Sequence, residues 1–96
     1  MGIVTEPWDV TEHLDSEEAI AAYLEAAFED GDLALITAAI NDVARACGMT
    51  EIAKRAGIAR GTLYKALGEG ANPTLSTLLA VMKALNVRLS VEPIAA

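Results

Sequence analysis

Apolar residues recur every three or four positions along most of this chain, which is the spacing expected of amphipathic helices. The pattern predicts a first helix that starts at Ser16 and stops at Gly31, and a second that Asp32 caps and Gly48 follows. Each helix would bury one face. The predicted inward positions are Ile20, Tyr23, Leu24, Ala27 and Phe28 in the first helix, then Leu33, Ile36, Ile40, Val43, Ala44 and Cys47 in the second.

Acidic pairs near the N-terminus resemble capping boxes, in which two side chains three residues apart satisfy the free N–H groups of a helix start. Asp9 with Glu12 and Asp15 with Glu18 have this spacing. They predict helix starts at both places, the earlier one within an N-terminal arm of residues 1–15.

Two shorter helices follow, the first capped by Thr50 and ended by Gly57, the second over about 59–67. Ala53 is small where the second helix must pass close over the first, and Gly57 can adopt the positive φ of a sharp turn. The apolar residues that would hold the pair together are Ile52, Ala56, Ile58 and Leu63. This combination over residues 49–68 is typical of a helix-turn-helix, although a generic helical hairpin shows parts of it.

After a loop over residues 68–72, Pro73 and Thr74 predict the start of a last helix that ends at Asn86, a candidate left-handed cap. Its inward positions are predicted to be Leu75, Leu78, Leu79, Met82 and Leu85. Apolar Val87, Leu89 and Val91 then alternate with polar residues, which predicts a strand over residues 87–92. Because no second strand is predicted, its partner would be a second copy or another protein, and a frayed tail is the alternative.

The predicted fold class is therefore all-α, a bundle of about five helices with one short C-terminal β-strand. A chain of 96 residues with 4% aromatic content suits one small helical domain better than a sandwich of strands. Its expected parts are the arm (1–15), an acidic helical part (16–47), the helix-turn-helix (49–68), the last helix (73–86) and the strand (87–92).

Charge divides the chain into two halves. Residues 1–44 contain eleven acids and no Lys or Arg, whereas residues 45–96 hold seven bases against three acids, a net charge of +4. Since salt screens charges beyond about 10 Å, the basic half can meet a polyanion despite the overall charge of −7. The acids either keep the protein soluble or form a surface for a cationic partner.

The second short helix carries the candidate DNA contacts. In a helix-turn-helix its N-terminal residues face base edges in the major groove, where Arg60 can donate two hydrogen bonds to a guanine. Lys65 suits a guanine or a phosphate, and Thr50 a phosphate oxygen. Tyr64 suits a thymine methyl or a phosphate, or else is a half-buried aromatic. The full candidate set is Thr50, Arg60, Gly61, Thr62, Tyr64 and Lys65.

An enzyme is the weakest interpretation, and no catalytic residue, cofactor or metal site is predicted. His13 is the single histidine, and Cys47 lies on an apolar stripe where packing is its expected role. The acidic run over 29–32 lacks the ligand spacing of a calcium loop. No apolar run is long enough to span a membrane and no secretory leader is evident, so a cytoplasmic location is expected.

The segment AGIARGTLYKALGEGANPTLSTLLAVMKALNVRL closely resembles the HigA-type antitoxins, putative addiction-module antidote proteins of the lambda-repressor-like helix-turn-helix superfamily. The resemblance extends upstream through PWDVTEHL, EEAIAAYLEAAFEDGD and ARACGMTEIA. Two positions depart from the family's pattern. Ala59 stands where a Ser cap is usual, which weakens the recognition helix by about 1 kcal/mol, and Glu51 replaces a common Gln and brings an acid near the DNA.

The resemblance implies a protein that neutralises a small basic toxin of the RelE/ParE-like fold and represses its own operon. The expected toxin-facing residues are Glu17, Glu18, Glu25, Glu29, Asp30 and Asp32. Repression at a palindromic, double-stranded operator implies a homodimer, for which Val87, Leu89 and Val91 and the apolar face of residues 75–85 are candidates. The alternatives are a stand-alone phage-type repressor without a toxin, and an interaction module that binds no DNA.

Overall fold

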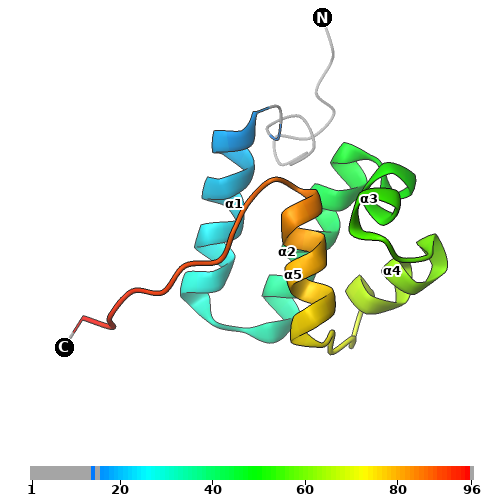
Figure 1. The fold of residues 1–96 in the computed structure, drawn as a ribbon. Coiled ribbons are helices and arrows are strands. Elements are labelled where there is room, and N and C mark those ends of the chain that lie inside the picture. Colours follow the sequence, from blue (N-terminus) through cyan, green and yellow to red (C-terminus); the bar gives the residue numbers. More distant parts are fainter. Residues whose placement is uncertain (1–13, 15, 96) are drawn as a thin grey trace, which may run out of the picture.

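Five helices form the described part of the protein, which in this computed structural model comprises residue 14 and residues 16–95. They are α1 (Glu17–Asp30), α2 (Leu33–Cys47), α3 (Met49–Ala56), α4 (Arg60–Leu67) and α5 (Leu75–Ala84). In Figure 1, α1 lies on one side of the bundle and α3 and α4 on the other, with α2 and α5 between them. The number and order of the helices agree with the sequence prediction.

Side chains and glycines set most of the helix ends where the sequence predicted them. The Asp32 carboxylate accepts a hydrogen bond from the Ala34 N–H, and the Thr74 hydroxyl one from the Thr77 N–H. Gly31 is left-handed with φ 80° and Asn86 with φ 64°. The cap of α1 is Ser16, whose hydroxyl accepts from Ala19 N–H, one residue later than the predicted Asp15. Asp15 itself and the Asp9–Glu12 pair lie outside the described residues.

The core is drawn from all five helices. Its largest fully buried side chains come from α2 to α5, and α1 adds Ile20, Leu24 and Ala27. The fully buried set is Ile40, Val43, Ile52, Leu63 and Val81. Polar groups inside are satisfied: the buried Thr37 donates to the carbonyls one turn earlier in α2, and no buried side-chain N or O atom of the described residues lacks a partner.

Four residues predicted to face inward are exposed instead. Leu33 and Cys47 are the first and last residues of α2, and both are exposed there. Leu75 and Leu79 are exposed because α5 packs mainly on α3, which covers only one side of it. Helical spacing finds an apolar stripe, but the lengths and positions of neighbouring helices decide how much of that stripe is covered.

The predicted strand over residues 87–92 is wrong for the isolated chain. After Asn86 the described residues run as a tail without secondary structure to Ala95, and the described part of the protein contains no strand. In Figure 1 this tail leaves the end of α5, crosses α1 and runs away from the bundle. A strand exists only when its backbone bonds to another strand, and the single chain supplies none.

The main packing pairs join helices that are close in the sequence. They are α1 with α2, α2 with α3, α2 with α4, α3 with α4 and α3 with α5. Helix α3 therefore touches three others and holds α4 and α5 in place. Helix α4 therefore packs on α2 and α3 with one side and is exposed to solvent on the other.

Candidate functional site

The turn between α3 and α4 is made by Gly57, Ile58 and Ala59. Gly57 is left-handed with φ 74°, and its N–H donates to the carbonyls of Ala53 and Lys54, which ends α3 sharply. Helix α4 begins after Ala59, whose backbone is extended but whose methyl group offers no capping hydrogen bond. The predicted cap at Thr50 is wrong, because α3 begins at Met49, after Gly48, and Thr50 lies inside its first turn.

Buried apolar residues hold α3 and α4 together as the sequence predicted. Ile52 is 1% exposed, Leu63 0% and Ala53 3%, while Ala56 and Ile58 pack against this core at its edge. All six candidate DNA-contacting residues remain exposed on the outside of the pair. We call the exposed residues Thr50, Glu51, Lys54, Arg55, Arg60, Gly61, Thr62, Tyr64 and Lys65 the α3–α4 surface.

Arg60 and Tyr64 contact each other on this surface. One guanidinium N–H of Arg60 donates to the Tyr64 hydroxyl over 3.2 Å, and its central carbon lies 5.1 Å from the ring centroid. Tyr64 is 42% exposed, so it is a surface residue rather than the half-buried aromatic that the sequence left open. A cation and an aromatic face attract each other, so the Tyr64 ring restricts the positions of the Arg60 guanidinium. The guanidinium keeps its full charge.

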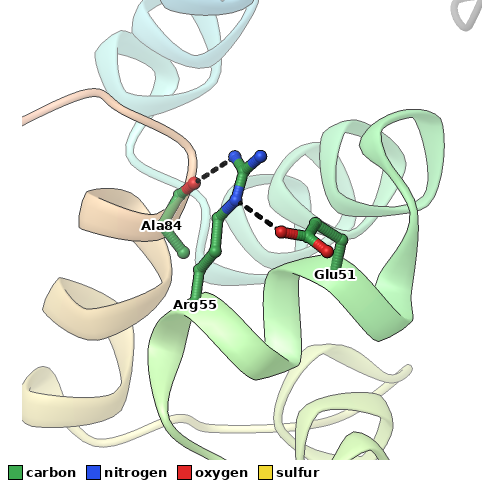
Figure 2. A network of polar contacts seen from close by, with 3 residues as sticks. All are labelled: Glu51, Arg55 and Ala84. Carbon is green, nitrogen blue, oxygen red and sulfur yellow. Dashed lines mark hydrogen bonds and ion pairs between the residues drawn. The ribbon is translucent and has the colours of Figure 1, made fainter.

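Arg55 has a structural role that the sequence analysis missed. Its Nε donates to the Glu51 carboxylate over 3.0 Å, and a second guanidinium nitrogen reaches the Ala84 carbonyl at 3.5 Å (Figure 2). The first contact has the i, i+4 spacing of a helical ion pair and was visible in the sequence. The second joins α3 to the end of α5 and has no local signal. The ion pair offsets the Glu51 charge close to the expected DNA surface.

The opposite side of the bundle carries the predicted acidic residues on α1 and at the start of α2. Glu17, Glu18, Glu25, Glu29, Asp30 and Asp32 are all exposed. Two of them have an intramolecular role: Glu17 accepts a hydrogen bond from the Asn86 side chain, and Asp32 caps α2. The other four make no side-chain hydrogen bond or ion pair within the described residues. We call Glu17, Glu18, Glu25 and Glu29, with the exposed Ala21, Ala22 and Ala26 among them, the α1 face.

A groove of about 600 Å³ runs between α1 and the C-terminal tail. Its lining combines apolar residues such as Leu24, Phe28 and Leu89 with the acids Glu25, Glu29 and Glu92 and the base Arg88. Apolar area with three carboxylates and one base suits a partner segment that combines apolar and cationic side chains.

Tyr23 fixes α1 against α2 beneath the α1 face. Its hydroxyl donates to the Asp42 carboxylate over 2.8 Å. Burial raises the pKa of Tyr23 from 10.0 to about 12, and the hydrogen bond and the charge of Asp42 add to the rise. The hydroxyl therefore stays protonated at neutral pH and holds the two helices in register.

The described residues show neither a membrane-spanning helix nor a cluster of potential metal ligands. None of their helices combines the length and the apolar character needed to cross a bilayer. No group of three or more His, Cys, Asp and Glu side chains among them is arranged to hold a metal ion. His13 lies outside the described residues.

Comparison with known proteins identifies the family. A family described as "Probable addiction module antidote protein" matches residues 4–93, nearly the whole chain. An uncharacterised protein of Haemophilus influenzae (strain ATCC 51907 / DSM 11121 / KW20 / Rd) is 48% identical over 85 residues, which are 88% of each chain. No solved structure matches significantly. This chain therefore belongs to the family of probable addiction module antidote proteins, a description that implies a toxin partner.

Proposed function

We propose that this chain is a HigA-type antitoxin that neutralises a small basic toxin of the RelE/ParE-like fold and represses its own operon. The observation that carries the proposal is the separation of charge across the bundle. Helix α1 has five acids and no base, whereas α3 and α4 together have four bases and one acid. The two sets lie on opposite sides of α5 (Figure 1), so two partners of opposite charge can bind at once.

The α3–α4 surface is proposed to act as a helix-turn-helix on double-stranded operator DNA. With α4 in the major groove, Arg60 would donate two hydrogen bonds to a guanine, and Tyr64 would hold that guanidinium in place. Lys65 would contact a guanine or a phosphate, and Thr50 a phosphate. Gly61 and Thr62 lie on the same first turn of α4 and would border the bases.

DNA binding is tested on the promoter upstream of the gene, with Arg60→Ala and Lys65→Ala measured singly and together. We expect each single change to weaken operator binding by about 1–3 kcal/mol, measured by fluorescence anisotropy at fixed salt. Lys83→Ala is the matched control, because Lys83 is an exposed base at the far end of α5. A double variant that binds like the wild type would rule out DNA binding through α4 and favour an interaction module.

Toxin binding is proposed to use the α1 face, with Asp30 and Asp32 at the end of the helix and the groove beside it. Four of the six acids lack an intramolecular partner within the described residues, so a cationic protein would not have to break an existing ion pair. Long-range attraction by such a surface speeds association and weakens with salt.

The toxin hypothesis is tested first by a tagged pull-down from the native host at moderate salt. A stoichiometric basic protein of about 100 residues is the expected product, and co-expression should rescue growth of cells that make it. The Glu18→Lys, Glu25→Lys, Glu29→Lys triple variant should bind that protein at least about 100-fold more weakly, at roughly 1 kcal/mol per charge. Glu69→Lys, an exposed acid in the loop before α5, is the control. Full affinity in the triple variant would disprove binding through α1.

A homodimer completes the proposal, since a two-fold operator is matched by a two-fold protein. The tail residues Val87, Leu89 and Val91 and the exposed Leu75 and Leu79 of α5 offer apolar area for it. Sedimentation at micromolar concentration should give a dimer with or without operator DNA. A monomer under both conditions, or a pull-down without any basic protein, would leave the simpler alternatives of an interaction module or a stand-alone repressor.

A further inference from the structure

Beyond Val87, the backbone of the C-terminal tail makes no backbone hydrogen bond within the described residues. The Val87 N–H donates to the Met82 carbonyl, which fixes the tail to the end of α5. From residue 88 to residue 95 no backbone group makes a backbone hydrogen bond within the described residues. A row of free N–H and C=O groups is the edge onto which another strand can add.

The side chains of the tail already alternate as they do in a strand. Val87 and Leu89 are half-buried and pack against the core, whereas Arg88 and Ser90 between them are exposed. The same period puts Val91 on the apolar side, yet Val91 is 97% exposed because the chain has by then left the bundle. The tail therefore has an apolar side that its own protomer covers only at the beginning.

The charges of the tail are complementary to those of a second tail running the other way. We propose that two copies pair residues 87–92 as an antiparallel two-stranded ribbon whose two-fold axis passes beside Ser90. Arg88 then lies opposite the partner's Glu92, and Leu89 lies opposite the partner's Val91. Opposite residues share a face of the ribbon, so the apolar side of both strands stays on one face.

Other registers lack this complementarity. Residues that face each other must both be odd-numbered or both even-numbered, since otherwise apolar side chains would meet polar ones. Centring the ribbon on Arg88 or Glu92 places like charges opposite each other, which destabilises an antiparallel pair. Centring it on Leu89 or Val91 leaves Arg88 without an acid opposite. The pairing beside Ser90 is the one that uses both charges, and neither has an ion-pair partner within the described residues.

This inference rests on the proposed homodimer, and a charge swap tests the register. Glu92→Arg and Arg88→Glu each put like charges opposite in two symmetric places. We expect each to raise the dimer dissociation constant at least about tenfold in analytical ultracentrifugation. The double variant Arg88→Glu, Glu92→Arg restores both pairs with opposite polarity and should return the constant to within about threefold of the wild type. Arg88 also borders the acidic α1 face, where Arg88→Glu adds a like charge. The double variant keeps that change, so recovery of the dimer in this variant distinguishes pairing within the ribbon from repulsion at α1.

A disulfide locates the two-fold axis directly. In a Cys47→Ser background, Ser90→Cys brings two cysteines opposite each other, within the Cα separation of about 4.4–6.8 Å that a disulfide spans. Mild oxidation should link the dimer at Ser90→Cys. The exposed serine of α5, Ser76→Cys, and the off-axis Val91→Cys should link poorly, because diagonal neighbours are about 7–8 Å apart.

Several outcomes would overturn the ribbon while leaving the proposed function separately measurable. A monomeric wild type, a dimer indifferent to the charge reversals, or preferred linkage at another position would each do so. If the reversals instead weaken the toxin complex and leave the dimer unchanged, the tail contacts the toxin and not a second copy, which also overturns the ribbon. The Glu18, Glu25 and Glu29 triple variant and the Arg60 variant report on toxin and operator binding in the same preparations.

Discussion

The α1 face and the α3–α4 surface differ in how firmly their charged groups are held. Arg55 and Arg60 each contact a partner in their own chain, whereas Glu18, Glu25 and Glu29 contact none within the described residues. Bidentate contacts to a base need donors at fixed positions, but attraction of a cationic protein acts over about a Debye length. One small bundle thus presents one surface suited to recognition by donors at fixed positions and another suited to long-range attraction.

The largest expected effect comes from removing the packing beneath α4. Leu63→Ala deletes a fully buried side chain that joins α4 to the core, so the free energy of unfolding should fall by roughly 2–5 kcal/mol in urea titrations. At a temperature where the variant is still folded by circular dichroism, operator affinity should fall far more than toxin affinity. Equal losses of the two affinities would mean that the surfaces are not independent.

A side-chain N-cap at the start of α4 should stabilise the α3–α4 pair. Ala59 already has the extended backbone of an N-cap, with φ −68° and ψ 146°, but no capping oxygen. Ala59→Ser supplies one and should raise the free energy of unfolding by about 1 kcal/mol. Chemical denaturation measures the gain, and Ala22→Ser, at an exposed position inside α1, is a matched control that should give none. No gain at residue 59 would show that the turn cannot accept the hydroxyl.

The stabilisation that Tyr23 gives to the packing of α1 on α2 should be lost at high pH, where its hydroxyl ionises. Tyr23→Phe removes the hydrogen bond to Asp42 and should cost about 1 kcal/mol of unfolding free energy at pH 8. Because the folded pKa is about 12 and the unfolded one 10.0, the wild-type advantage is complete below pH 10 and lost as pH rises toward 12. The two proteins contain the same lysines, so the contribution of lysine titration cancels when their unfolding free energies from urea titrations are compared at each pH from 8 to 12. A constant difference between the two proteins would contradict the raised pKa.

The smallest expected effect concerns Gly61 in the first turn of α4. A Cβ built there meets no atom within 4 Å, so Gly61→Ala should stabilise the protein by about 0.5–1 kcal/mol through the unfolded chain. Operator affinity measured on the same variant decides between two roles. A fall in affinity would show that the backbone approaches the DNA closely, and an unchanged affinity that the glycine is only tolerated.

Local patterns made most of the helices predictable. Caps such as Asp32 and Thr74 act within three residues, and left-handed stops such as Gly57 need no distant partner, so the sequence shows them directly. The face of a helix is harder to predict at its ends, where coverage depends on where neighbouring helices stop. Leu33, the first residue of α2, was misjudged for this reason, whereas Leu75 lies on a side of α5 that α3 leaves uncovered.

The exposure of the candidate DNA-contacting residues was predictable from the sequence, but the contacts among the residues of the α3–α4 surface were not. The exposure of Arg60, Tyr64 and Lys65 followed from which side of α4 carries Leu63 and Leu67. The reach of Arg55 to the Ala84 carbonyl spans 29 positions and depends on how α5 crosses α3. The strand failed for a related reason, since its formation requires a chain that the sequence of one copy cannot supply.

The order of packing along the chain has a consequence for how quickly the antidote becomes available. Each main contact joins helices that are adjacent or one apart in sequence, so the contact order is low. Helical bundles of this kind fold in microseconds to milliseconds. A ribosome working at about 5–20 residues per second needs roughly 5–20 s to make these residues. The search for the fold of one chain therefore adds no delay to its synthesis.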